Sequence, residues 1–224
     1  MKLVSAILAR NEAGPDRYLR RVLSRCLAFS DTVVLLDDRS TDATPVIAQE
    51  MGCVVRTRAA QDPAWGQESS ARQELWEFAR EYATHRDDWI LICDADQVLV
   101  GDIRGLCQSF ECTAWAFILY DLWSESEYRE DQFWQAHNTP RVWLVAPNRV
   151  PSDYVAEWSP RGMHTGHFPT NLPLQALVAP PDSYYWLHFG WSTPEHRQRK
   201  YEAYMREATK LSPSELAHVQ SILQ

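Results

Sequence analysis

The sequence has no long apolar run and no excess of basic residues, and both absences narrow the class of protein. Its longest uninterrupted apolar stretch runs from Ala114 to Tyr120, far short of the ~20 residues that a membrane-spanning helix needs. Lys and Arg number 22 against 30 Asp and Glu, which gives a net charge of −8. A net negative charge argues against a protein whose main function is to bind nucleic-acid phosphates. The sequence therefore predicts no membrane span and a main task other than nucleic-acid binding.

Cysteine is sparse and irregularly spaced. The chain has 5 cysteines, an odd number, and none of them form a CxxC pair. Cys53 and Cys93 lie inside apolar, strand-like runs, where a buried thiol is the usual finding. We therefore expect a protein of the reducing cytoplasm. The opening Met1–Ala9 has the basic-then-apolar order of a secretory signal but runs directly into Arg10-Asn11-Glu12, so we interpret it as a first strand.

What is present is the composition of one globular domain, with 224 residues of which 45% are hydrophobic and 23% charged. The first hundred residues alternate short apolar runs with amphipathic segments, which predicts βαβ units and a mostly parallel central sheet flanked by helices. The predicted strands are Leu3–Ala9, Thr32–Leu36, Cys53–Arg58 and Trp89–Cys93, and the predicted helices are Arg17–Ala28, Asp42–Met51 and Gln67–Tyr82.

The regular alternation ends after residue 100, and the second half is less regular. We predict strands at Thr113–Tyr120, Arg141–Ala146 and Tyr184–Phe189, then a helix Pro194–Lys210 with Thr193 as N-cap and a last helix capped by Ser212. We expect this half to shape specificity.

Polar clusters follow three of the predicted strands. They are Arg10-Asn11-Glu12, Asp37–Asp42 and Asp94-Ala95-Asp96. In open α/β sheets the loops at the carboxyl ends of the strands line the ligand crevice, so we expect the clusters to converge. Asp94 and Asp96 form a DXD motif whose alternate side chains could face one divalent cation, or a cation and a ribose. The alternative is a strand-end turn with solvated carboxylates.

The cluster after the second predicted strand has two features. Ser40 or Thr41 would cap the following helix, with Asp42 in its first turn, where the helix dipole favours an anion. Capping does not explain why Asp37 and Asp38 are adjacent, since two neighbouring carboxylates repel each other unless a ligand uses them.

Four motifs in order resemble the nucleotide-binding half of family-2 glycosyltransferases with the GT-A fold. They are Ile7–Glu12, Asp37–Thr44, Ser70–Gln73 and Trp89–Asp96. The resemblance covers residues 3–100 and implies one GT-A domain over residues 1–224, with a nucleotide-binding half (1–100) and an irregular half (101–224) that binds the acceptor and completes the metal site. The chain departs from the family pattern at Arg39 and Ala43, where Gly is usual, and at Gln73, where Asn is common.

The resemblance also implies roles for individual residues. Asp38 and the loop after the first strand would hold the base, Arg72 would lie near the phosphates, Asp94 would approach the ribose or the metal, and Asp96 would ligate Mn²⁺ or Mg²⁺. The residues expected to bind the nucleotide sugar are Ala9, Arg10, Asn11, Glu12, Asp37, Asp38, Arg72 and Asp94.

A segment near the end of the chain adds a metal ligand. Tyr185–Trp191 and the residues that follow it, up to Tyr201, are similar to a segment of some of these transferases in which a histidine on the last strand completes the metal site. His188 is therefore the candidate ligand beside Asp96 and Asp94, and the alternative is a core histidine hydrogen-bonded to backbone. The basic run Arg197–Lys200 is either a solvated helix face or a surface that faces the diphosphate.

An inverting transfer needs a general base that takes the proton from the acceptor hydroxyl. The family often has an acidic pair at a comparable position, and Glu130-Asp131 resembles it, with Asp131 preferred. The alternative is that the run from Tyr120 to Trp134 is an exposed acidic connection, and Glu157 is a further candidate base.

Histidines and tryptophans of the second half have weaker functional signals. His164 and His167 have only loosely metal-like spacing, and their loop is predicted to be a lid on the substrate side. The chain has 10 Trp residues; aromatic faces pack on sugar rings, but we expect most of these to lie in the core.

Together these features predict an inverting, metal-dependent hexosyltransferase that moves a sugar from a nucleotide-diphosphate donor, preferably a UDP-sugar, to a hydroxyl. Candidate acceptors are a glycan, a lipid-linked precursor, a small molecule, a protein, or a hydroxylated nucleic-acid base. For the last, a local phosphate-binding surface could come from Arg17, Arg20, Arg21, Arg25, Arg197, Arg199 and Lys200.

Two alternatives stay open. Asp94–Val98 also resembles the DxDx(T/V) nucleophile motif of haloacid-dehalogenase-like phosphatases, although that motif follows the first strand of its fold. A non-catalytic domain that binds a nucleotide sugar or a glycan is the second alternative.

Overall fold

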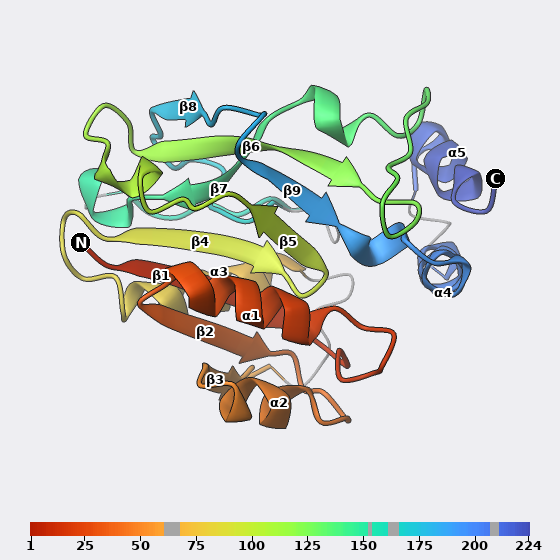
Figure 1. The fold of residues 1–224 in the computed structure, drawn as a ribbon, viewed down its shortest axis with the longest axis horizontal. Helices are drawn as coiled ribbons and strands as arrows, with labels where there is room; N and C mark the ends of the chain where they lie inside the picture. The colour runs from red at the N-terminus through yellow and green to blue at the C-terminus, as the bar shows by residue number, and fades with distance from the viewer. Residues whose placement is uncertain (61–67, 152–153, 161–165, 207–210) are drawn as a thin grey trace.

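The computed structural model describes residues 1–60, 68–151, 154–160, 166–206 and 211–224. In these residues the strands form one mixed sheet of nine strands with helices on both faces (Figure 1). The strand order is β3-β2-β1-β4-β7-β6-β9-β5, and β8 pairs with β6 outside this path.

The first half of the chain forms the parallel part of the sheet. Its elements are β1 (Leu3–Ala9), α1 (Leu19–Phe29), β2 (Thr32–Asp37), α2 (Thr44–Glu50), β3 (Val54–Thr57), α3 (Glu68–Arg80) and β4 (Trp89–Asp94). β1 pairs in parallel with both β2 and β4, and β2 pairs in parallel with β3. Every strand and helix predicted for this half is present, so the βαβ pattern is confirmed.

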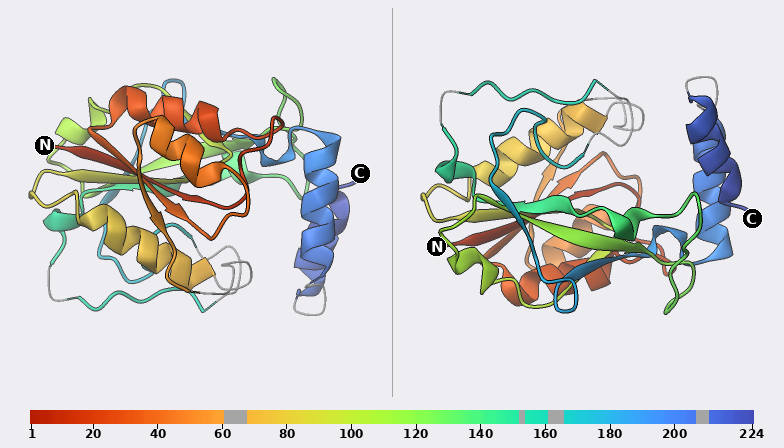
Figure 2. Two further views of the ribbon diagram at one scale, coloured as in Figure 1. Left: turned by 90° about the horizontal axis from the view of Figure 1, so that it is seen from below. Right: turned by 90° about the horizontal axis from the view of Figure 1, so that it is seen from above.

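The two faces of this sheet bury different sets of side chains. Leu3 and Ile7 of β1 pack in one apolar cluster with α1 and α2, whereas Val4 and Ala6 pack in a second cluster with α3. Strands covered on both faces are apolar at almost every position, as expected for a buried parallel sheet. Figure 2 shows α1 and α2 on one side of the sheet and α3 on the other.

The second half extends the sheet mainly with antiparallel pairs. Its strands are β5 (Gln97–Val100), β6 (Ala114–Asp121), β7 (Arg141–Val145), β8 (Ala176–Val178) and β9 (Tyr185–His188). β7 joins β4 to β6, and β9 lies between β6 and β5. β6, β7 and β9 confirm predicted strands. The sequence did not predict β5 and β8, because both are short and β8 is exposed at each position.

Two helices close the chain beside the carboxyl ends of β1, β2 and β4 (Figures 1 and 2). Helix α4 (Pro194–Met205) begins after Thr193, whose side chain accepts a hydrogen bond from the backbone N–H of His196, as predicted. The predicted extension of this helix over residues 207–210 lies outside the described residues. Helix α5 (Pro213–Ser221) follows Ser212 in a capping box, which confirms Ser212 as its cap.

Several expectations about composition can be checked against burial. Cys53 and Cys93 are buried, and they and the other cysteines, all described, are free thiols, as expected. Most of the tryptophans of the second half lie in the core, including Trp143 and Trp186, which are 1% exposed. Among the described residues, no helix combines the length and the apolar character that crossing a bilayer requires.

Candidate functional site

The three polar clusters that follow β1, β2 and β4 converge at one edge of the sheet, as predicted from their positions at the carboxyl ends of the strands. Because these strands run in parallel, their carboxyl ends point the same way, toward α4 (Figure 1). β9 ends at the same edge with His188, which pairs in register with Gln97 of β5 and with Asp121 of β6. Residues separated by about a hundred positions in the chain are thereby brought together.

The loops after β1 and β2 are hydrogen-bonded to each other. The backbone N–H of Asn11 donates to Ser40 Oγ at 2.9 Å, and the N–H of Thr41 donates to Asn11 Oδ1 at 2.8 Å. The prediction that Ser40 or Thr41 caps the next helix is therefore wrong: the N-cap of α2 is Ala43, with no side-chain cap hydrogen bond. Both hydroxyl residues fix the paired loops because Asn11 lies within reach of them.

Arg39, where the family pattern has Gly, adopts a backbone φ of 57°, in the left-handed region that favours glycine. Its guanidinium donates a hydrogen bond to the carbonyl of Arg58 at 3.3 Å. The loop therefore keeps the glycine-like conformation although its residue has a Cβ.

Asp37 and Asp38 are both buried, and each carboxylate has its own partner. Asp37 accepts from the backbone N–H of Ser40 at 3.2 Å. Asp38 Oδ1 lies 3.0 Å from Arg58 Nη1, and its Oδ2 lies 3.7 Å from Arg10 Nη1. The expectation that only a ligand could relieve the repulsion between these carboxylates is therefore wrong, because Arg58 and Arg10 supply a counter-charge to Asp38 and a backbone N–H stabilises Asp37.

Arg58 is a residue of this region that sequence reasoning missed. Its side chain is 1% exposed, lies at the end of β3, and also donates to Ser70 Oγ at 2.6 Å. The only sequence signal for Arg58 was its position at the end of a predicted strand. Its pairing with Asp38 depends on how β3 lies beside β2 and could not be predicted from the sequence.

Asp94 is held by residues from three separate segments. Its Oδ1 lies 2.7 Å from Arg72 Nη2 on α3, and its Oδ2 lies 3.6 Å from His167 Nε2. Gln97 also donates to Oδ2 at 3.3 Å. Burial alone would raise the pKa of Asp94, but Arg72 and His167 outweigh burial and hold this pKa well below its usual range. The structure thus brings Arg72 and Asp94, two of the residues expected to bind the nucleotide sugar, into direct contact.

The loop predicted to be a lid is described only in part. His164 lies outside the described residues. His167 is partly buried beside Asp94 and therefore belongs to the candidate site, which its loose spacing with His164 did not predict.

Asp96, His188 and Asp121 form a row of two carboxylates around one imidazole. Asp96 Oδ2 lies 3.4 Å from His188 Nε2, and Asp121 Oδ1 lies 2.6 Å from His188 Nδ1. Burial alone would lower the pKa of His188, but Asp96 and Asp121 raise it to about 9. The pKa of Asp96 is correspondingly held well below its usual value, against burial, by Lys200 and His188.

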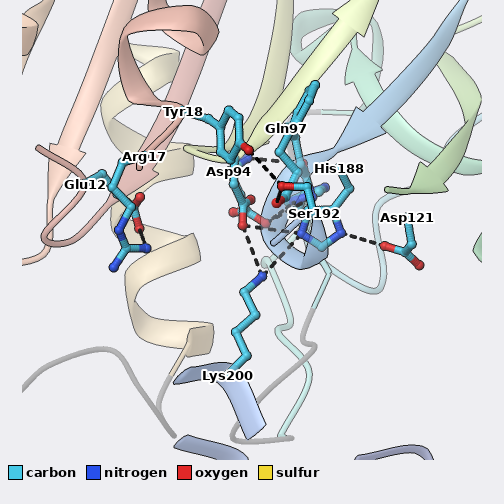
Figure 3. Close-up of polar contacts among 12 residues, drawn as sticks. Glu12, Arg17, Tyr18, Asp94, Gln97, Asp121, His188, Ser192 and Lys200 are labelled. Atoms are coloured by element: carbon cyan, nitrogen blue, oxygen red, sulfur yellow. Dashed lines mark hydrogen bonds and ion pairs between the residues drawn. The ribbon is translucent and has the colours of Figure 1, made fainter. Parts of the chain in front are cut away.

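Lys200 reaches this row from the second turn of α4. Its Nζ lies 3.1 Å from Asp96 Oδ2 and 3.4 Å from His188 Nε2, and 4.4 Å from the centre of the Trp191 ring. Figure 3 shows Lys200 extending toward His188, with Asp121 on the other side of the imidazole. The basic run Arg197–Lys200 was expected to be either a solvated helix face or a surface that faces the site. Lys200 faces the site.

The donor atoms of Asp96 and His188 fit a divalent cation. A carboxylate oxygen and an imidazole nitrogen face each other, and the other ring nitrogen of His188 is fixed by Asp121, as is usual for metal-ligating histidines. Among the described residues no group of three or more His, Cys, Asp or Glu forms a complete metal site. A cation here would thus need further oxygen ligands, such as those of a diphosphate, which is how Mg²⁺ is often held.

Glu12, in the loop after β1, is a partly buried carboxyl near this row. Its Oε1 lies 3.2 Å from Arg17 Nη1 (Figure 3), and its backbone N–H donates to Thr44 Oγ1 at 2.7 Å. Burial, with a smaller contribution from the charge of Asp96, raises the pKa of Glu12 to about 7, although Arg17 acts in the opposite direction.

The predicted base residues have local partners. Asp131 Oδ2 lies 2.6 Å from Arg129 Nε, and its Oδ1 accepts from the backbone N–H of Phe133 at 2.7 Å. Glu130 is exposed, with its Oε1 3.3 Å from His137 Nε2. Of the acidic stretch from 121 to 131, Asp121 is the residue that contacts His188. From the sequence, Asp121 was only one of several acidic residues in this stretch. Its contact with His188 depends on the pairing of β6 with β9, which the sequence does not reveal.

Comparison with known proteins adds to this geometry. No protein-family model matches the chain. Rv3786c, an uncharacterized protein of Mycobacterium tuberculosis, is 28% identical over 220 residues, which cover 92% of this chain and 50% of that protein. The chain therefore spans about half the length of the curated relative that it matches.

Two solved structures align with almost the whole chain. TarS of S. aureus aligns over 100% of this chain and 42% of its own, with a TM-score of 0.51 and 17% identity. A mannosyltransferase from Pyrobaculum calidifontis, in complex with GDP-Man and Mn²⁺, aligns over 99% of this chain and 69% of its own, with a TM-score of 0.46 and 13% identity. The likeness to TarS shows that the chain has the GT-A-type fold of nucleotide-diphospho-sugar transferases, as its sequence predicted.

Proposed function

We propose that this chain is a nucleotide-sugar transferase, in which Asp96 and His188 hold a divalent cation and Asp94 and Arg72 bind the nucleotide. The observation that carries the proposal is the meeting of Asp96 Oδ2 and His188 Nε2 at 3.4 Å, at the carboxyl ends of the parallel strands. In open α/β sheets this edge is where ligands bind. The GT-A-type fold supports the same assignment.

Each part of the site has a task in this proposal. Mn²⁺ or Mg²⁺, when bound, would neutralise the negative charge that develops on the departing nucleoside diphosphate. Asp121 fixes the His188 ring so that Nε2 faces Asp96. Arg72 holds the Asp94 carboxylate ionised, ready to accept hydrogen bonds from ribose hydroxyls. The paired loops after β1 and β2, with Glu12 and Asp38, would surround the base.

We also propose that the transfer inverts the anomeric carbon and that the donor is a UDP-sugar. Both proposals rest on the resemblance to family-2 transferases. The attacking hydroxyl must lose a proton, and we retain Asp131 and Glu130 as the proposed bases for this step. The acceptor is proposed only as a hydroxyl compound.

A phosphatase is a weaker candidate. In this chain the DXD motif follows β4, the fourth strand, and Asp94 is held by Arg72 and Gln97. A phosphatase would form an aspartyl-phosphate on Asp94, which mass spectrometry of the intact protein would detect. A transferase leaves both carboxylates unmodified.

The proposal is tested by isothermal calorimetry of UDP, UDP-sugars and GDP with and without Mn²⁺. We expect the chain to bind a nucleoside diphosphate more tightly with Mn²⁺, and Asp96→Asn to lose this metal-dependent gain. Asp182→Asn is a matched control, because Asp182 is exposed near the opposite end of β9. Failure of all nucleotides to bind, with and without metal, would contradict the proposal. Turnover of a bound nucleotide sugar would then separate an enzyme from a non-catalytic binder.

A further inference from the structure

The ammonium group of Lys200 lies against the two atoms of Asp96 and His188 that would hold a divalent cation. Its Nζ is 3.1 Å from Asp96 Oδ2 and 3.4 Å from His188 Nε2, and those two atoms are themselves 3.4 Å apart. The three atoms therefore form a nearly equilateral triangle. A metal ion bound to both Asp96 and His188 at ordinary ligand distances of ~2.0–2.2 Å, on the side that faces Lys200, would be too close to an ammonium group in this position.

The surroundings of Lys200 Nζ are suited to a cation. The Trp191 ring covers it at 4.4 Å from its centre, and an aromatic face attracts a positive charge. The Asp96 carboxylate supplies a full negative charge on another side. The side chain is 26% exposed, so the ammonium group can leave this position toward solvent.

Gly190 is what allows these groups to approach so closely. A Cβ added to Gly190 would lie 2.5 Å from Asp96 Oδ2 and 2.6 Å from His188 Nε2, and in direct overlap with Lys200 Nζ. Its backbone φ is outside the left-handed region, so glycine is required here for space and not for conformation. Any larger residue at position 190 would therefore push these three groups apart.

We propose that Lys200 is a built-in cation of the site, which fills the metal position when no metal is bound and must withdraw before a divalent cation can bind to Asp96 and His188. This inference rests on the proposed metal site and adds a competitor to it. It predicts that Lys200 weakens metal binding, whereas a lysine that only binds a ligand would leave metal affinity unchanged.

The test is direct Mn²⁺ binding, measured by electron paramagnetic resonance without nucleotide. We expect Lys200→Met to bind Mn²⁺ at least about tenfold more tightly than the unmodified chain, because the positive charge that competes with the metal for Asp96 and His188 is removed. Arg199→Met is the matched control: it removes the same charge from the same helix, but Arg199 pairs with Asp16 and has no contact with Asp96. The double variant Lys200→Met with Asp96→Asn should lose the gain.

A measurement on the unmodified protein avoids the risk that Lys200→Met disturbs folding. The chain has lysine only at positions 2, 200 and 210, so ¹³Cε-lysine labelling gives a spectrum in which Lys200→Arg identifies the Lys200 signal. We expect diamagnetic Mg²⁺ to shift this signal as the ammonium group leaves Trp191 and Asp96, and to leave the Lys2 signal in place.

The outcomes separate the inference from the proposed function. Equal Mn²⁺ affinity in Lys200→Met, Arg199→Met and the unmodified chain would overturn the inference, even where nucleotide binding persists. A Lys200 signal that does not move when Mg²⁺ binds would overturn it as well. If the unmodified chain bound no nucleotide, this result would contradict the proposed function, whatever the metal affinities are.

Discussion

His188 links two carboxylates that lie on different strands, with Asp121 Oδ1 2.6 Å from its Nδ1 and Asp96 Oδ2 3.4 Å from its Nε2. Asp121 and His188 are directly paired in the β6–β9 register, so the sheet itself sets the first of these contacts. The imidazole then has one nitrogen committed to Asp121 and one facing Asp96. Asp121 is thus a positioning residue for the candidate metal site.

We expect Asp121→Asn to weaken Mn²⁺ binding by about 10- to 100-fold, the usual cost of losing the carboxylate partner of a metal-ligating histidine. Calorimetry or electron paramagnetic resonance would measure this loss. Asp131→Asn is the comparison, since Asp131 contacts Arg129 and should leave metal affinity unchanged. Equal losses in both variants would mean that Asp121 acts through general charge and not through His188.

Glu12 predicts how the stability of the metal-free protein depends on pH. Its pKa in the folded chain is about 7 against 4.5 for an ordinary Glu, so the folded state binds the proton more tightly than the unfolded state does. The contribution of Glu12 to the free energy of unfolding is complete below pH 4.5. It falls by up to about 3 kcal/mol as the pH rises through 7.

Glu12→Gln removes this titration. We expect the variant to match the unmodified chain at pH 4 and to be more stable at pH 8, as measured by urea unfolding at both pH values. Glu195→Gln changes the same residue type at an exposed position of α4 and should show no such difference. A Glu12→Gln variant that is less stable at pH 8 would mean that the Arg17 ion pair outweighs the burial of the carboxylate.

The buried pair of Arg58 and Asp38 predicts a large loss of stability when one partner is removed. We expect Arg58→Leu to lower the free energy of unfolding by about 3–5 kcal/mol, because it leaves the Asp38 carboxylate buried with a weaker counter-charge. Arg56→Leu is the control: Arg56 is two residues away and pairs with exposed Glu81, so its loss should cost about 1 kcal/mol or less. Similar losses in both variants would contradict this account.

The left-handed backbone of Arg39 predicts that glycine is favoured there. Arg39→Gly should raise the free energy of unfolding by up to about 1 kcal/mol, since a residue with a Cβ pays roughly 1–2 kcal/mol in this region. Arg39→Ala keeps the strain and loses the hydrogen bond to Arg58, so it should be less stable than Arg39→Gly. Chemical denaturation would measure both, and the reverse order would contradict the prediction.

The proposed base is tested by turnover. We expect Asp131→Asn to lower kcat by about 10²- to 10⁴-fold, the typical contribution of general-base catalysis, with donor binding unchanged. Glu130→Gln tests the second residue of the pair. Because Asp131 also contacts Arg129 and Phe133, thermal unfolding must accompany the kinetics. A loss of activity that follows only from a loss of folded protein would assign Asp131 a structural role.

Much of the first half could be predicted from the sequence because its signals are local. The apolar runs of β1 and β4 are continuous, and each helix between them has an apolar stripe, so element type and order follow from short windows. The convergence of Glu12, Asp38 and Asp94 at one edge then follows from parallel strands alone.

The rest of the site depends on contacts that no short window contains. Arg58 meets Asp38 only because β3 lies beside β2, and Asp121 meets His188 only through the β6–β9 pairing. Lys200 was visible as part of a basic run, but its approach to Asp96 depends on how α4 packs against the 3-10 turn Phe189–Trp191. The cap at Ser40 or Thr41 was predicted wrongly because Asn11, thirty residues away in sequence, competes for those groups.

The long sequence separation between the DXD motif and β9 has a consequence for how the site is made during synthesis. β5 pairs with β9, and Asp96 meets Lys200 across 104 residues, so the nascent chain carries both carboxylates of the DXD motif long before it carries His188. Contacts of such long sequence separation form late and slowly, because the intervening chain must first be ordered. The nucleotide-binding strands can therefore assemble as an early folding unit, whereas the cation-binding corner is completed only after β9 and α4 have been synthesised.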